Sequence, residues 1–179
     1  MLGLGFTMSA SDAQALIRRD PRNADVLYPY VNGEDLNSRP DSSGSRWIVN
    51  FGERTEAQSR TFAEPWAWIE ERVKPWRMTK DGVKYPRMVD EWWKYWNARP
   101  GLRAANRWPV PRPGDHPGQQ GRYPVRVPTG QVFSHAAAVF ATNDMADLAL
   151  LSSAPHYWWA ISHASTMGNV LRYTPSDQK

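Results

Sequence analysis

The sequence contains no cysteine among its 179 residues. This absence excludes disulfides, thiolate metal sites and cysteine nucleophiles, and a cytoplasmic location fits it. No apolar run approaches the roughly 20 residues of a membrane span, so we expect no membrane partner. The first six residues lack both a basic stretch and a long apolar core, so we do not expect a signal peptide.

Motifs for catalysis and for metal binding are also missing. The sequence has no glycine-rich cofactor loop and no catalytic Asn-Pro-Pro-aromatic motif, both of which a DNA methyltransferase would need. Glu34, Asp35 and Asp41 are not followed by the acid-x-Lys pair that a metal-dependent nuclease needs. The four histidines lack close metal-ligand spacing, and the adjacency of Ser134 and His135 does not make a catalytic pair. We therefore expect no catalytic residue, no metal and no cofactor in this chain.

Positive charge is concentrated in one part of the chain. The net charge is only +4, but residues 72–126 hold 13 Lys or Arg against 4 Asp or Glu, a balance of +9. The remainder holds 9 against 14, a balance of −5. A local positive field favours a polyanionic partner such as nucleic acid, although a solvated basic face explains composition alone equally well. Most of the ten tryptophans lie at helical core spacing, so we expect them in the core.

The order of apolar patterns predicts a single mixed α+β domain with short, mainly antiparallel strands and several packing helices. In the strand predicted over 46–51, Trp47, Val49 and Phe51 form the buried face. Further strands are expected over 131–135, over 136–141 and, less clearly, over 122–127. Helices are expected from Ser9 to the residue before Pro21 and over 64–74, 86–98, 143–151 and 155–164, with a helical turn over 55–62.

Several blocks of the sequence resemble one known family. Tyr-Pro-Tyr-Val-Asn-Gly-Glu-Asp-Leu-Asn at 28–37, followed by Ser-Arg-Trp-Ile-Val-Asn-Phe at 45–51, resembles the start of the target recognition domain of MmeI-like enzymes. These are large restriction–modification proteins that join methyltransferase, nuclease and DNA-reading parts in one polypeptide. The likeness continues in order through Val-Lys-Pro-Trp-Arg at 73–77, Glu-Trp-Trp at 91–93, Val-Phe-Ser-His at 132–135, 150–156 with Trp158, and Arg-Tyr-Thr-Pro-Ser-Asp at 172–177.

The resemblance implies that residues 1–179 are a non-catalytic DNA target recognition domain from a larger bacterial phage-defence enzyme. Its partners would be double-stranded DNA and the methyltransferase domain of the parent chain. That parent, with or without a nuclease, would bind S-adenosylmethionine and methylate adenine at N6. The main alternative is a protein–protein interaction or scaffold module with an aromatic interface. A small hydrolase using Ser134 or a pair of carboxylates is a third possibility.

The basic connector over 74–87 is bounded by prolines and offers donors to DNA phosphates. Loop residues near 32–45 are expected to read base edges, although an ordinary surface connection with a solvated Glu34 and Asp35 is the alternative. Arg46 could instead pair with one of these acids and brace the loop. A proline-rich insertion at 110–121 departs from the paired strands expected in the family. The expected DNA-binding residues are Asn37, Arg39, Arg46, Lys74, Arg77, Lys80, Lys84, Arg87, Arg107, Arg112, Arg122 and Arg126.

Overall fold

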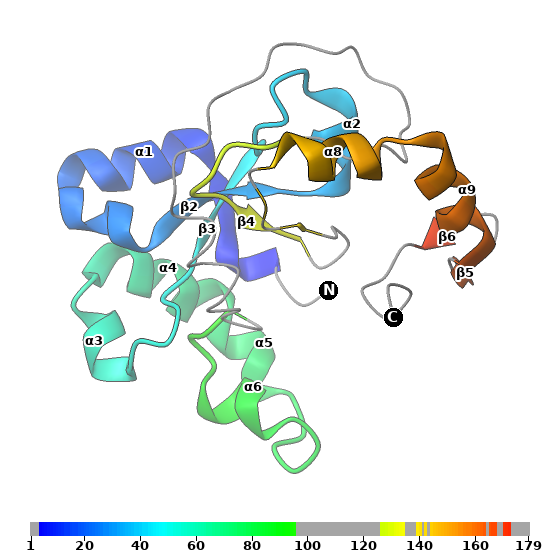
Figure 1. Ribbon diagram of the computed structural model, residues 1–179. Coiled ribbons are helices and arrows are strands. Elements are labelled where there is room, and N and C mark those ends of the chain that lie inside the picture. The colour runs from blue at the N-terminus through cyan, green and yellow to red at the C-terminus, as the bar shows by residue number, and fades with distance from the viewer. Residues whose placement is uncertain are drawn as a thin grey trace.

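The computed structural model describes residues 4–95, 126–134, 139–140, 142, 144–163, 165–167 and 170–172. Within these ranges helices pack around a mixed sheet of short strands (Figure 1). The predicted α+β class is therefore confirmed. No helix in these ranges has the length and apolarity needed to cross a lipid bilayer.

The main sheet has the strand order β1-β3-β2-β4. These strands are β1 (Thr7–Ser9), β2 (Leu27–Val31), β3 (Arg46–Val49) and β4 (Val132–Phe133). β3 runs antiparallel to both of its neighbours, whereas β4 joins β2 in parallel. A separate antiparallel pair is formed by β5 (Ser165–Met167) and β6 (Val170–Arg172). The expected predominance of antiparallel pairing is confirmed, and β4 lies within the strand predicted over 131–135.

Side-chain hydrogen bonds at Ser9 and Thr55 begin two of the helices of the first half. A 3₁₀ turn, η1 (Leu4–Phe6), precedes β1. The Ser9 hydroxyl accepts from the Asp12 amide at 3.0 Å and opens α1 (Ala10–Arg19), which ends before the 3₁₀ helix η2 (Pro21–Asp25). Thr55 caps α3 (Glu56–Arg60) in the same way, and α4 (Ala63–Arg72) follows. These helices agree with the predicted ones to within a few residues.

The basic connector and the helix predicted after it differ from expectation. The connector contains the short helix α5 (Lys74–Met78), and α6 (Pro86–Asp90) ends well before residue 98. Residues 91–95 form turns in which the carbonyls of Trp92 and Lys94 accept from the Arg77 guanidinium. The Trp93 indole donates to the Arg54 carbonyl at 3.3 Å. These long-range bonds replace the local helical bonds that the apolar spacing predicts, so the predicted extent of this helix was wrong.

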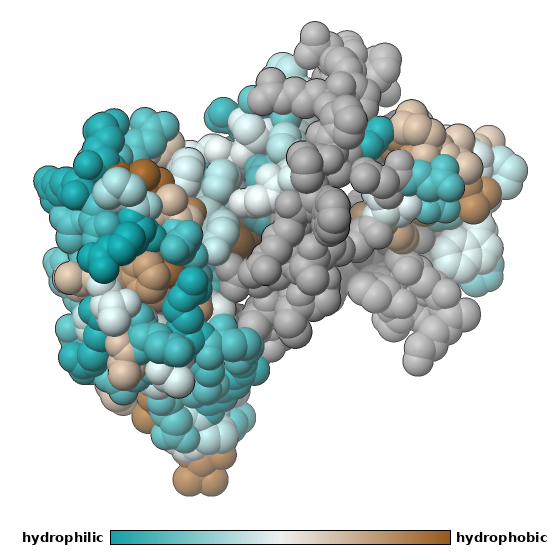
Figure 2. All heavy atoms as spheres, turned by 60° about the vertical axis from the view of Figure 1, so that its left-hand side comes forward, coloured by the Kyte–Doolittle hydropathy of each residue, from teal (hydrophilic) through white to brown (hydrophobic). Residues whose placement is uncertain are grey.

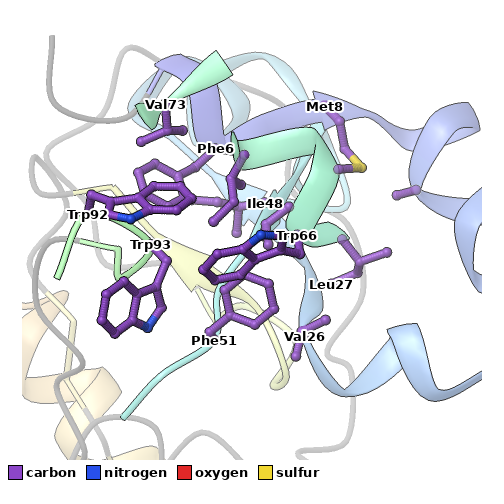
Figure 3. Packing of buried hydrophobic residues seen from close by; sticks show 13 residues of the cluster. Phe6, Met8, Val26, Leu27, Ile48, Phe51, Trp66, Val73, Trp92 and Trp93 are labelled. Carbon is purple, nitrogen blue, oxygen red and sulfur yellow. The ribbon is translucent and has the colours of Figure 1, made fainter. Parts of the chain in front are cut away.

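The core is built around a cluster of aromatic side chains (Figure 3). The ring centroid of Trp66 lies 4.9 Å from that of Trp92, in an edge-on arrangement, and 6.1 Å from that of Phe51. Trp93 is also buried here. The expectation that tryptophans at helical spacing belong to the core is confirmed for these three.

The one-sided burial predicted for the strand over 46–51 is wrong. Ile48 and Val49 are both fully buried although they point to opposite faces, and Asn50 is buried as well. Trp47, expected on the buried face, is only partly buried. The reason is that β3 is an inner strand whose two faces are both covered.

The stretch between β2 and β3 begins with a helix where only a turn and a loop were expected. α2 (Gly33–Ser38) follows Asn32, whose side-chain oxygen accepts from the Asp35 amide at 2.9 Å. The Asp35 carboxylate in turn accepts from the Asn32 amide at 3.0 Å, which completes a capping box. Asp35 is buried. The alternative interpretation, in which Glu34 and Asp35 are both solvated, is therefore wrong for Asp35.

The second half contains two further helices that the sequence predicts. Asp144 caps α8 (Met145–Leu151), and α9 (Ala154–His163) follows beside it. The apolar spacing of Met145, Leu148 and Leu151 predicts that this helix packs inward, but no residue of α8 is buried, so that prediction was wrong. α8 packs against α9. Residues 126–128 and 139–140 are neither helix nor strand, which contradicts the strands predicted there; the rest of the predictions over 107–125, 135–138 and 141 fall outside the described residues.

Candidate nucleic-acid interface

A rigid exposed turn connects α5 to α6, and we call residues 79–85 the basic turn. The Asp81 carboxylate accepts from the amides of Val83 at 2.8 Å and Lys84 at 3.3 Å. The Asp81 carbonyl accepts from the Tyr85 amide at 2.8 Å. These bonds preorganise the backbone. The turn projects Val83, which is 94% exposed, into solvent.

Two lysines of the basic turn lie beside aromatic rings. The Lys80 ammonium is 4.2 Å from the Trp76 ring centroid, and the Lys84 ammonium is 5.5 Å from that of Tyr85. Neither lysine forms an ion pair within the described ranges. Because a ring attracts a cation without neutralising its charge, both ammonium groups stay available to an anionic partner.

Lys74 and Arg87, also expected at phosphates, are neutralised locally. Lys74 lies 2.7 Å from the Glu70 carboxylate, and this hydrogen bond holds the pKa of Glu70 below its usual value. Arg87 lies 2.9 Å from the Glu91 carboxylate, in another pair spaced by one helical turn. Both are partly exposed, but a phosphate would compete with an existing carboxylate at either residue.

Arg77 lies in the interior, which corrects its expected place on the DNA-facing surface. Its side chain is 2% exposed, and Nη1 donates to the carbonyls of Trp92 at 3.0 Å and Lys94 at 2.9 Å. The guanidinium also lies 4.9 Å from the centroid of the Phe6 ring. Burial lowers the pKa of Arg77 to about 10. Its first role is therefore to hold the turns after α6 against the core.

The two arginines that were predicted to contact bases near the loop after α2, Arg39 and Arg46, have different surroundings. Arg39 Nε donates to the Ser43 hydroxyl at 3.0 Å and lies 3.9 Å from the Asp41 carboxylate. Arg46, at the start of β3, is exposed and forms no ion pair with Glu34 or any other acid in the described ranges. Arg46 therefore does not act as the brace that was the alternative.

The remaining predicted residues complete the set. The backbone of Asn37 belongs to α2. Arg126 Nη1 lies 2.9 Å from the Met145 sulfur, at the beginning of α8. Arg107, Arg112 and Arg122 fall outside the described residues. In the described part of the chain, no group of three or more His, Asp or Glu residues could hold a metal ion.

The structure does not bring the predicted DNA-binding residues into one cluster. α2 and the basic turn lie at opposite ends of the molecule (Figure 1). Arg46 belongs to the first region, and Lys80 and Lys84 belong to the second. A partner that contacts both regions must therefore be extended, as a DNA duplex is.

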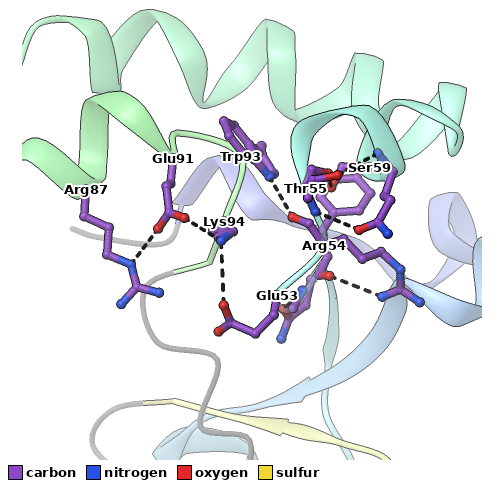
Figure 4. A network of polar contacts seen from close by, with 12 residues as sticks. Glu53, Arg54, Thr55, Ser59, Arg87, Glu91, Trp93 and Lys94 are labelled. Carbon is purple, nitrogen blue, oxygen red and sulfur yellow. Dashed lines mark hydrogen bonds and ion pairs between the residues drawn. The ribbon is translucent and has the colours of Figure 1, made fainter.

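Sequence reasoning missed three residues of these surfaces. Trp76 and Tyr85 were not singled out, although each lies within four residues of its lysine, a spacing that could have indicated the pairs. Lys94 was missed as well; it donates to Glu91 and lies 3.6 Å from Glu53 (Figure 4). The Glu91-Lys94 spacing of three residues was the available signal.

A contrasting apolar surface lies on α8 and α9. Leu150 is 66% exposed and Trp158 is 65% exposed, and Met145 and Trp159 are exposed too. Figure 2 shows apolar colouring over this part of the chain, away from the largely hydrophilic surface of the N-terminal half. Several large exposed apolar side chains on neighbouring helices are typical of a protein-binding surface.

Comparison with known proteins finds no family model, no curated protein and no solved structure that matches this chain.

Proposed function

We propose that this chain is a non-catalytic recognition domain that binds double-stranded DNA and supplies sequence specificity to a restriction–modification-type methyltransferase. The observation that carries the proposal is the pair of uncompensated lysines, Lys80 and Lys84, on a rigid exposed turn. Lysine ammonium groups contact backbone phosphates and fix the register of a protein on the duplex. The ordered resemblance to MmeI-like target recognition domains supports the methyltransferase context.

Base reading is assigned to the other region, where Arg46 is exposed and unpaired by any acid in the described ranges. An arginine fork can donate two hydrogen bonds to guanine O6 and N7 in the major groove. Arg39 is held by Ser43 and has less freedom to do so. Arg46 is therefore the first candidate for a base-specific contact.

The cofactor belongs to another domain in this proposal. The parent enzyme would bind S-adenosylmethionine, methylate adenine N6 in the bacterial cytoplasm and act in phage defence. Calorimetry of the isolated chain with S-adenosylmethionine should show no binding, and methyl-transfer and nuclease assays should show no turnover. Clear heat of binding in that titration would contradict the assignment of a purely reading role.

Selection of bound duplexes from a random library tests the function directly. The expected result is enrichment of one short sequence. General affinity for polyanions, which retention on heparin would reveal, would not enrich any sequence. The selection should be repeated with a methyltransferase domain attached, because the isolated chain presents only part of the expected interface. A library that stays random in both formats, although the protein is folded, would contradict sequence-specific recognition.

The exposed apolar face of α8 and α9 favours a second candidate, a protein-interaction module. In the first proposal, the same face would dock on the methyltransferase domain of the parent chain. Replacing Leu150 and Trp158 by serine should then impair association with that domain and leave duplex binding unchanged. Loss of duplex binding in this variant, with the fold retained, would place DNA on the apolar face instead.

A further inference from the structure

A small pocket between α5 and α6 is lined mainly by charged side chains. Its lining residues are Arg77, Arg87, Met88, Glu91 and Lys94. It has room for one water-sized group, about 10 Å³. Three of the side chains are cationic and one is anionic, so the pocket carries an excess of positive charge.

The buried guanidinium of Arg77 is only partly satisfied. Nη1 donates to two backbone carbonyls, but Nε and Nη2 are buried and make no hydrogen bond in the described part of the chain. The carbonyls supply dipoles and no net negative charge, and Arg77 forms no ion pair with a described carboxylate. Buried charges and buried donors ordinarily have partners, so this arrangement calls for an acceptor at the pocket.

The charges around the pocket are paired with two carboxylates, Glu91 and, through Lys94, Glu53 at 3.6 Å. Glu91 accepts from Arg87 on one side and from Lys94 on the other, as Figure 4 shows. Glu91 therefore neutralises part of the positive charge that lines the pocket. It makes no hydrogen bond to Arg77 among the described contacts. An acceptor in the pocket would lie beside the Arg77 side chain, which carries the two unused donors, with Arg87 and Lys94 close by.

We propose that this pocket is an oxyanion site that takes one oxygen of a phosphate group against Arg77. The small volume excludes a whole phosphate and fits a single oxygen, which can accept from a charged guanidinium donor. The phosphate can be free or can belong to a DNA backbone. Occupation by free phosphate is independent of the proposed function, whereas occupation by a backbone phosphate rests on it.

The full chain, labelled with ¹⁵N, provides a direct readout through the Arg77 Nε–Hε signal. Inorganic phosphate is titrated against chloride at constant ionic strength, and a duplex is titrated in a second arm. An oxyanion at Nε should move the Arg77 Hε signal downfield and saturably. A shift with phosphate alone supports a free-phosphate site, and a shift with duplex supports a backbone phosphate.

Arg87→Gln should weaken phosphate binding about fivefold, because it removes one cation from the rim. Arg60→Gln is the matched control, since Arg60 forms a similar one-turn pair with Glu56 away from this pocket. Equal effects of the two variants would overturn the proposal. So would an Arg77 signal that moves with neither ligand, even if the duplex binds. A duplex that does not bind at all contradicts the proposed function, and the phosphate arm then decides the pocket alone.

Discussion

The buried carboxylate of Asp35 accepts from the backbone amide of Ser45 at 3.2 Å and so ties the first turn of α2 to the beginning of β3. The same carboxylate closes the capping box at Asn32. One side chain therefore holds both ends of the segment 32–45. This segment contains Arg39 and is followed directly by Arg46. The proposed reading loop is thus held from inside by Asp35, in addition to the exposed Arg39–Asp41 pair.

Asp35→Ala should lower the free energy of unfolding by about 2–4 kcal/mol, because it removes a helix cap and leaves the amides of Asn32 and Ser45 without their acceptor. Urea denaturation followed by circular dichroism measures this. Glu34→Ala is the matched control: it is the exposed neighbour in the same turn and should change stability by less than about 0.5 kcal/mol. Equal losses in the two variants would show that Asp35 does not hold the loop.

Phe51→Ala should cost about 3–5 kcal/mol of stability, because its fully buried ring packs against Trp66 and Phe62. Trp47→Ala should cost less, about 1–2 kcal/mol, since Trp47 is only partly buried although its side chain is larger. Denaturant melts of both variants give the comparison. A larger loss of stability for Trp47→Ala would support the sequence-based prediction that Trp47 lies on the buried face of the strand.

Helix starts were predictable because their signals are local. Ser9 and Thr55 each cap a helix from a position readable in the sequence. The capping box at Asn32 is equally local, but Asn32-Gly33 reads as a turn and hides it. The pairs that neutralise Lys74 and Arg87 also follow a visible spacing of four residues.

The corrections arise from contacts between residues distant in sequence. The interior position of Arg77 depends on hydrogen bonds to carbonyls 15 and 17 residues later in the sequence. The same contacts end the helix predicted over 86–98. Apolar periodicity cannot anticipate these bonds because it describes only the faces of a regular element. Likewise, Ile48 is buried because the face of β3 on which it lies is covered, and the packing of other elements on a strand is not readable from that strand alone.

Acid should destabilise the protein partly through Glu91. The hydrogen bond from Lys94 holds the pKa of Glu91 below its usual value, and a second bond from Arg87 acts in the same direction. A depressed folded-state pKa gives stability that is present above the unfolded value, about 4.3 for glutamate, and is lost as pH falls through the folded value. Thermal melts between pH 7 and pH 3 should therefore show a smaller acid-induced loss in Glu91→Gln. Profiles that run parallel in both proteins would rule out this contribution.

Arg46→Ala should leave the melting temperature unchanged, because Arg46 is exposed and braces no described acid. If Arg46 reads a guanine, the variant should lose about 1–3 kcal/mol for the selected duplex and keep most of its non-specific affinity. Titrations on matched and single-mismatch duplexes measure this. Arg18→Ala, another exposed arginine, should affect neither quantity. A lower melting temperature with unchanged mismatch discrimination would make Arg46 a structural residue.

The salt dependence of duplex binding tests DNA contact by the basic turn most directly. Each neutralised phosphate contributes about −0.9 to the slope of log affinity against log salt concentration. Lys80→Ala/Lys84→Ala should therefore make the slope less steep by about 1.8 and weaken all duplexes alike. The control Arg18→Ala/Arg22→Ala removes the same charge from α1 and η2 and should keep the original slope. A flat salt dependence of the unmodified protein, or equal slopes for it and the lysine variant, would contradict DNA binding through the basic turn.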